Sequence, residues 1–414
     1  MAKEDLTIEQ LVEKGFGIDV HKEMMMVTIM GKGIKKQTRE FKTFTEDLEL
    51  CRQWIEEQGI TQGAMESTGV YWKPVFNILT ESLQIKLVNA RHIKNVPGRK
   101  TDVKDSEWIC KLLLSGLLNG SFVPPELTRE TRDIYRYKVK MTQAGASEKN
   151  RIQRILEDAN IKLSSVVSDM SGATAIKLID GIIAGRTDIN ELVEENYHGK
   201  LSASKSDLKK AMTGRLTEHH KYMLLEIKDH IKYLEEKIKH LEQKLEEKLS
   251  AYQTEIQLLD TIPGVDTEAA IGIISEIGTD MSVFANEQKF ASWAGMCPGN
   301  NESAGKKKSS RITHGNKTFK ALLVQVAWAA TRTKGTYLRA KYDSLVGRRG
   351  KKRALIAVGH KILCSIYHIL KNKEAYKELG STFLEEKKIK NKLKSINQQL
   401  KDLGYEQVVL KQAI

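Results

Sequence analysis

The sequence lacks the features that place a protein in a membrane or in an oxidising compartment. It has no run of about 18 uncharged apolar residues, which is the length a membrane-spanning helix needs. Its first residues are not a basic stretch followed by an apolar one, so no secretory signal peptide is expected. Its four cysteines lie far apart without a Cys-x-x-Cys pair, which favours reduced thiols over a zinc site or a disulfide framework. We therefore expect a cytoplasmic protein with no membrane partner.

Positive charge is concentrated in one part of the chain. Of the 67 Lys and Arg residues, fifteen lie between Lys306 and Arg353, together with only one of the 53 acids, Asp343. The rest of the chain therefore carries 52 charges of each sign and is neutral. A localised basic segment indicates a polyanionic partner held in one place. Charge alone also fits a solvated basic face.

The first 120 residues alternate between strand and helix patterns. The three strands that come first form a predicted meander, and the order of elements is then helix, strand, helix, strand, helix. This βββαβαβα order is, by analogy, that of the ribonuclease-H/RuvC-type nuclease fold. The expected strands cover residues 16–20, 24–30, 36–44, 63–66 and 85–89, and the expected helices cover 45–57, 71–83 and 102–118.

Four acids of this region are candidates for one site. Asp19 interrupts a buried strand between Ile18 and Val20, where an unpaired charge is costly. Glu66 ends another strand, and Asp102 and Asp105 lie three residues apart at the start of a helix. Converging carboxylates repel one another unless divalent cations neutralise them, and carboxylate oxygens suit magnesium or manganese. Taken singly, Asp102 also fits a helix cap, and Asp105 a solvated acid near the helix dipole.

The middle of the chain carries a heptad pattern. Apolar residues from Leu224 to Leu245 follow one another in alternating steps of three and four, with Glu and Lys between them. The pattern predicts a coiled-coil seam of about three heptads. Its partner is either a helix of the same chain, for which residues 130–160 are a candidate, or a second protomer.

The last third of the chain reads as mainly helical. Residues 259–277 resemble a helix-hairpin-helix, in which loop amides meet a nucleic-acid phosphate. Asp266 stands where such a hairpin has a glycine, so a simple packing role remains open. Further helices are expected at 317–331 and 354–371, followed by a charged helical tail from 380.

These patterns divide the chain into four parts. The predicted fold class is α/β plus α. The parts are a RuvC-like domain (1–128), a helical linker with the coiled coil (129–255), a C-terminal helical domain (256–375) and a charged helical tail (376–414).

Several short motifs resemble those of the DEDD transposases of the insertion-sequence-110 family, which includes the Piv-type DNA invertases. In the first domain they are Gly17 to Lys22, Met65 to Tyr71 and Arg99 to Asp105. Near the other end, Gly295 to Pro298, Glu302 to Gly305 and Arg311 to Asn316 are similar to that family's C-terminal block. Both blocks occur in the family's order, with a coiled-coil middle between them.

The resemblance implies a recombinase that cuts and rejoins DNA. Asp19, Glu66, Asp102 and Asp105 would bind Mg²⁺ or Mn²⁺, and Ser303 would attack a phosphodiester and hold the cut end as a phosphoserine ester. The implied partners are the DNA of the element ends and of the target, and a structured guide RNA, the bridge RNA, from the element. The protein would associate with the nucleoid when it is bound to DNA.

The residues themselves give Ser303 only modest support. It lies in a polar, glycine-containing stretch where most serines are turn residues, and Ser309 and Ser310 are rivals. Basic side chains follow at once and would stabilise the charge that develops on a scissile phosphate. The candidate nucleic-acid-binding residues are Lys306, Lys307, Lys308, Arg311, Asn316, Lys317, Arg348 and Arg349. His21 and His314 lie beside the motifs and are interpreted as phosphate contacts or structural hydrogen-bonding groups.

The two halves of the chemistry lie far apart in the sequence. Either one chain folds the two parts together, or the carboxylates of one protomer meet the serine of another, in a homodimer or tetramer formed through the coiled coil. We favour the second arrangement, composite sites. Two alternatives remain: a RuvC-like nuclease that cuts without rejoining, and a non-catalytic nucleic-acid scaffold. The nuclease leaves Ser303 without a role, and the scaffold does not require all four carboxylates.

Overall fold

The computed structural model of the chain describes residues 11–67, 69–89, 102–118, 120–199, 201–299, 301–303, 306–309 and 311–404. Within these ranges the side chains of 102–104, 301–303 and 306–308 lie outside the description. The chain forms two compact units, residues 1–123 and 124–414, and each is described by itself.

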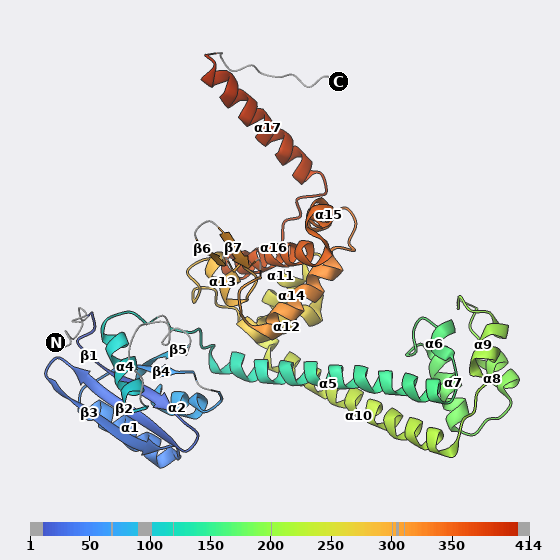
Figure 1. The fold of residues 1–414 in the computed structure, drawn as a ribbon, viewed down its shortest axis with the longest axis horizontal. Helices are drawn as coiled ribbons and strands as arrows, with labels where there is room; N and C mark the ends of the chain where they lie inside the picture. The colour runs from blue at the N-terminus through green and yellow to red at the C-terminus, as the bar shows by residue number, and fades with distance from the viewer. Residues whose placement is uncertain are drawn as a thin grey trace. The chain divides into compact units, whose positions relative to one another are not determined.

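The first unit contains a five-stranded sheet in the order β3-β2-β1-β4-β5 (Figure 1). Strands β1 (Lys14–Val20), β2 (Met24–Gly31) and β3 (Ile34–Lys42) form an antiparallel meander. Strand β4 (Gln62–Glu66) runs parallel to β1, and β5 (Gln84–Val88) runs parallel to β4. Six of the seven β1 residues are buried, as expected for the central strand.

Helices cover both faces of this sheet. Helices α1 (Thr45–Glu57) and α2 (Trp72–Leu79) share a core with the β1 side chains Phe16, Ile18 and Val20. Helix α4 (Asp102–Leu114) packs against β1, β2 and β4. The observed order of strands and helices confirms the predicted βββαβαβα succession among the described residues, and this mixed sheet is consistent with a ribonuclease-H-like domain.

The second unit contains two long helices that lie side by side (Figure 1). They are α5 (Glu126–Asp158) and α10 (Glu218–Lys248). Five of the predicted seam residues of α10 are buried: Leu224, Ile227, Ile231, Leu234 and Leu245. The structure thus provides a partner for the seam within the same chain, in the region that the sequence proposed.

Four short helices, grouped around a separate apolar core, connect the long pair. They are α6 (Leu163–Val166), α7 (Ala173–Ile183), α8 (Ile189–Asn196) and α9 (Lys205–Met212). No clear pattern was found in this stretch of the sequence, because each helix is too short to show several turns of apolar periodicity.

The C-terminal part is mainly helical, as expected. The predicted helices at 317–331 and 354–371 are confirmed as α14 (Lys317–Ala330) and α16 (Lys351–Asn372), and the tail contains α17 (Phe383–Asp402). Other elements were not expected: α13 (Glu287–Trp293), α15 (Tyr337–Arg349) and a hairpin of β6 (Asn301–Ser303) and β7 (Lys306–Ser309).

Among the described residues, α16 is the one helix that is long and apolar enough to cross a membrane by length and composition. Half of its most apolar stretch is buried inside the protein, and it packs against α11 (Gln253–Asp260), α13 and α14. These contacts are those of a core helix.

The segment that resembles a helix-hairpin-helix joins α11 to α12 (Thr267–Ile277). The Asp266 carboxylate accepts the amide hydrogen of Ala269 and so caps α12. Gly264 has a positive φ of 87°, and a Cβ there would stand 2.4 Å from the amide nitrogen of Ala330 in α14. This turn therefore packs closely on α14, which supports the packing role over a phosphate contact.

Candidate functional site

A close contact between β1 and α4 positions the carboxylates. A Cβ atom on Gly17 would stand 2.3 Å from the carbonyl oxygen of Ser106, so only glycine lets the helix come this near. The Ser106 hydroxyl also lies 2.8 Å from that of Thr28, which β2 places opposite Gly17. The beginning of α4 is thus held against the centre of the sheet.

This contact brings three of the predicted acids together. Asp19 lies two residues beyond Gly17 and therefore on the same, α4-covered face of β1. The parallel pairing of Ile18 with Met65, continued by one residue, brings Glu66 level with Asp19 on the neighbouring strand. Asp105 directly precedes Ser106, and its negative charge acts on Asp19 together with that of Glu66.

Asp19 is the most enclosed of these acids, with 7% of its surface exposed. Burial raises the pKa of the Asp19 carboxyl above its ordinary value, and the charges of Glu66 and Asp105 raise it further. The His21 ring opposes the rise in pKa, because its Nε2 lies 3.2 Å from Asp19 Oδ2. His21 thus contacts a site carboxylate directly, in agreement with its interpretation as a structural hydrogen-bonding group.

The donor chemistry of this cluster fits a divalent metal. Its side chains offer only carboxylate oxygens, and their mutual repulsion is what a cation would relieve. Among the described side chains, no three His, Cys, Asp or Glu groups already stand in the arrangement of a metal site. Asp102, the fourth predicted ligand, begins α4, but its side chain lies outside the described residues.

Ser303 is the last residue of β6, paired with Lys306 of β7. The sequence predicted a turn serine in a polar, glycine-containing loop, whereas the described residues Asn301–Ser303 and Lys306–Ser309 form paired strands. The pairing continues in the residues that flank the two strands. Pro298 forms an antiparallel β-bridge with Ile312, and the Gly299 amide donates to the Arg311 carbonyl at 2.9 Å. Backbone pairing therefore extends beyond the two strands themselves.

Two glycines hold the base of this hairpin. A Cβ on Gly315 would stand 2.3 Å from the amide nitrogen of Gly295, and one on Gly295 would stand 2.9 Å from the amide nitrogen of Gly315. Two backbone segments lie in direct contact here, which leaves no room for side chains. The side chains of Ser303 and of Lys306, Lys307 and Lys308 lie outside the described residues, and their predicted roles stay predictions.

Charged and polar side chains form a network around the buried acid Glu276. Glu276 of α12 is fully buried, and Arg136 of α5 donates to both its carboxylate oxygens, at 2.7 and 2.9 Å. Asn316 donates its side-chain amide to Glu276 at 2.6 Å, and its side-chain oxygen accepts from the Phe319 amide at 3.1 Å. Asn316 thus caps α14 and joins it to α5 and α12. Its predicted contact with nucleic acid is untested.

The buried acid acts on both nearby arginines. The hydrogen bond to Glu276 raises the pKa of Arg136 above its ordinary value. Arg132 donates to the Glu276 backbone carbonyl, and burial lowers the pKa of its guanidinium. Glu276 was not among the candidate residues predicted from the sequence. The available signal was a single acid inside the apolar run of 270–277.

The other predicted cations are accessible. Arg311, Lys317, Arg348 and Arg349 are all exposed. They lie at the base of the hairpin, at the first turn of α14 and at the last turn of α15. Exposed cations of this kind are available to a polyanion in solution.

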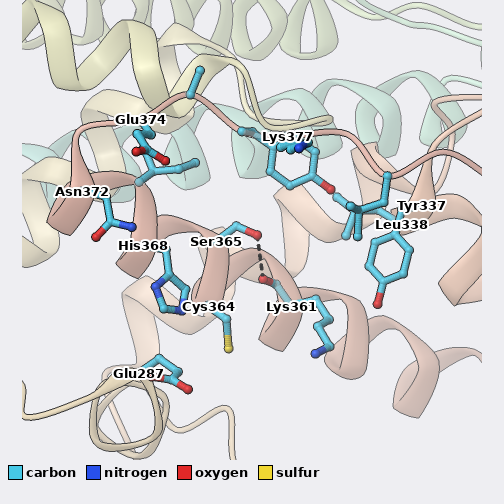
Figure 2. Close-up of a pocket in the computed structure, with 14 residues that line it drawn as sticks. Glu287, Tyr337, Leu338, Lys361, Cys364, Ser365, His368, Asn372, Glu374 and Lys377 are labelled. Carbon is cyan, nitrogen blue, oxygen red and sulfur yellow. Dashed lines mark hydrogen bonds between the residues drawn. The ribbon is translucent and has the colours of Figure 1, made fainter. Parts of the chain in front are cut away.

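A pocket of about 440 Å³ in the C-terminal part contains none of the predicted site residues. Figure 2 shows Lys361, Ser365 and His368 of α16 in its wall, with Glu287 of α13 nearby. The Ser365 hydroxyl donates to the Lys361 carbonyl of its own helix at 3.2 Å. The pocket lining mixes acids and bases and does not coincide with the carboxylate cluster or the hairpin.

Two family models match the chain, one over the part with the carboxylate cluster and one over the part with the hairpin. A transposase model of the DEDD type, from the IS110 group, matches residues 16–161, which include the carboxylates. A model described as "Transposase IS116/IS110/IS902 family" matches residues 256–343, which include the hairpin. The two matches support an IS110-family transposase. Comparison with curated proteins gave no match. Transposases bind DNA, and DEDD transposases generally use a divalent metal.

Proposed function

We propose that this transposase cuts and rejoins DNA strands for a mobile insertion sequence, with a metal-binding carboxylate site and Ser303 as nucleophile. The observation that carries the proposal is the convergence of Asp19, Glu66 and Asp105 where β1, β4 and α4 meet. Burying an acid beside two further acids costs stability, and such a cost is typical of a functional site.

The carboxylates and the basic residues have separate tasks in this scheme. Asp19, Glu66, Asp102 and Asp105 would hold Mg²⁺ or Mn²⁺, which when bound activates an attacking oxygen and stabilises a leaving one. Lys306, Lys307, Lys308 and Arg311 would hold the scissile phosphate and stabilise its developing negative charge.

The proposed covalent step conserves the phosphodiester bond. The Ser303 oxygen loses its proton and attacks the phosphorus, a phosphoserine ester forms, and the bond to one DNA oxygen breaks. That oxygen takes up a proton and leaves as a hydroxyl. In rejoining, a hydroxyl of the incoming strand attacks the ester and Ser303 recovers its proton, so no external energy source is needed.

The proposed partners are DNA, an element-encoded guide RNA and further copies of the transposase. The guide would supply sequence recognition by base pairing, as the family resemblance implies. A homodimer or tetramer would form through the helical pair of α5 and α10. The exposed apolar residues Tyr222, Leu225 and Tyr233 of α10 support a second protomer there.

The carboxylates and Ser303 belong to different units of the chain. We expect the carboxylates of one protomer to act with Ser303 of another. Mixing the Asp105→Asn and Ser303→Ala proteins tests this, because only composite sites let two inactive variants restore activity. A mixture as inactive as its components would contradict the composite arrangement.

Strand exchange measured with purified transposase, magnesium, DNA and co-purified RNA tests the whole scheme. Asp105→Asn and Ser303→Ala should each abolish exchange, and Ser309→Ala, a neighbouring hydroxyl on β7, should not. Cleavage that survives Ser303→Ala would indicate a RuvC-like nuclease without rejoining. DNA binding unaffected by both substitutions, with no cleavage by the unaltered protein, would indicate a scaffold.

A further inference from the structure

A groove of about 510 Å³ runs between α15 and α17. Its lining has the same spacing, i, i+3, i+4 and i+7, on each helix, so each helix contributes one continuous face. The residues are Lys341, Ser344, Leu345 and Arg348 of α15, and Leu384, Lys387, Lys388 and Asn391 of α17.

Aromatic contacts attach the start of α17 to α15. The rings of Tyr337 and Phe383 meet edge to face with their centroids 5.7 Å apart. Within α17, the Lys387 ammonium lies 5.9 Å from the centroid of the same Phe383 ring. The groove is therefore formed by packing between the two helices and not by one helix alone.

The charge of the groove is entirely positive. Four of its eight lining residues are cations, and none of the eight is an acid. Burial lowers the pKa of Lys341, and the positive charges of Lys361, Lys387, Arg348 and Lys388 lower it further. Asp343, the acid of α15, is held by Arg339 at 2.7 Å and does not line the groove. The lining cations thus repel one another without compensation from an acid in the lining.

We infer that this groove binds the phosphate backbone of duplex DNA, as a contact additional to the one proposed around Ser303. Seven residues of helix extend about 10 Å. Along that length one strand of duplex DNA presents about three phosphates. The four cations on the two facing helix walls span such a row and suffice to neutralise its charge.

DNA is the favoured polyanion, and in this respect the inference rests on the proposed function. Transposases bind DNA, and the groove has the composition of a contact that ignores base sequence. Its lining offers cations, a serine and one asparagine around Leu345 and Leu384, which suits phosphates better than base edges. The tail helix α17 would then hold DNA of any sequence against the C-terminal part.

Fluorescence anisotropy of the full chain with a labelled duplex that has no element sequence tests this contact. A chelator in place of magnesium prevents cleavage, so that binding alone is measured across a salt series. Lys387→Gln with Lys388→Gln should reduce the salt slope of log affinity by about 1.8, which corresponds to two lost phosphate contacts. Lys341→Gln removes a cation from the opposite wall and should reduce the slope by about 0.9.

The matched control is Lys390→Gln with Lys392→Gln, which removes the same charge from α17 outside the groove lining. Its effect on the slope should be less than half as large, and Lys387→Arg with Lys388→Arg should keep the slope of the unaltered protein. Equal slopes for groove and control variants would overturn the inference. The same salt series would also be measured with a duplex RNA of the same sequence. A loss of affinity in the groove variants that is seen only with this RNA would overturn the inference as well.

The test of the groove can fail or succeed independently of the test of the proposed Ser303 chemistry. If Ser303 forms no adduct but the groove variants lose DNA, the recombination scheme fails and the groove stands. If the adduct forms and the groove variants bind DNA normally, only the groove inference fails.

Discussion

Gly17 of β1 lies directly against Ser106 of α4. A methyl group on Gly17 would stand 2.3 Å from the Ser106 carbonyl oxygen and 2.5 Å from the amide nitrogen of Cys110. Since Asp19 follows Gly17 and Asp105 precedes Ser106, the same contact sets the distance between the two acids. Because Gly17 has no side chain, α4 can approach β1 closely enough to bring the two acids together.

Gly17→Ala should therefore damage both the fold and the site. The added methyl group meets backbone atoms, which cannot rotate away, so α4 must shift from the sheet. We expect a loss of about 1–3 kcal/mol in unfolding free energy. Urea unfolding measures this loss, and calorimetric titration of magnesium measures the weakening of the site.

Gly145→Ala is the matched control for that substitution. Gly145 lies inside α5, and a Cβ there meets nothing within 4 Å. Alanine favours a helix over glycine by about 1 kcal/mol, so this variant should be as stable as the parent or more so. If Gly17→Ala behaved in the same way, the close contact would not be what positions α4.

Glu276→Gln should destabilise the second unit strongly. The substitution leaves Arg136 and Arg132 without a buried counter-charge, and breaking such a pair costs about 3–5 kcal/mol. Glu268→Gln is the control, because Glu268 is largely exposed and its partner Lys138 keeps a second acid, Glu242. That change should cost less than about 1 kcal/mol. Equal urea midpoints for the two variants would show that the buried network contributes little.

His360 should make stability depend on pH. Burial and the charge of Lys361 hold the pKa of its imidazole below the ordinary value, and Glu287 opposes them. The unfolded chain, with a His pKa near 6.5, therefore binds the proton more readily than the folded chain. Stability should rise with pH through the interval below about 6.5 and be lost as pH falls through it.

Urea unfolding between about pH 5 and 8 measures this dependence. His360→Gln should reduce the loss at low pH. His240→Gln, at an exposed position of α10, should leave the loss unchanged. A pH profile that is identical in the parent and in His360→Gln would exclude His360 as its source.

Much of the first unit was predictable from the sequence, because successive side chains of a strand point to opposite faces of the sheet. Phe16, Ile18 and Val20 face one core, and Gly17 and Asp19 lie on the other face, which is the pattern that predicted a strand with an unusual acid. The convergence with Asp105 was expected from the positions of the acids at strand and helix ends, and from the motifs. Its physical cause, the contact of Gly17 with Ser106, involves residues far apart in sequence.

The C-terminal part was less predictable. Helix α15 has one buried residue, Leu338, and many charges, so it shows no apolar stripe. The hairpin at Ser303 contains the run Lys306 to Lys308, which has no strand preference, and backbone contacts such as Gly295 with Gly315 impose its shape. The buried acid Glu276 depends on arginines in α5, about which its own helix carries no information.

The most direct test of the account is a search for a covalent protein–DNA adduct. Purified transposase would be incubated with magnesium, a suspected recognition DNA and co-purified RNA, and then analysed on a denaturing gel beside Ser303→Ala. We expect an adduct that is absent from the Ser303→Ala lane and present with Ser309→Ala. Free cut ends without an adduct, unaffected by Ser303→Ala, would contradict it and leave a metal-dependent nuclease.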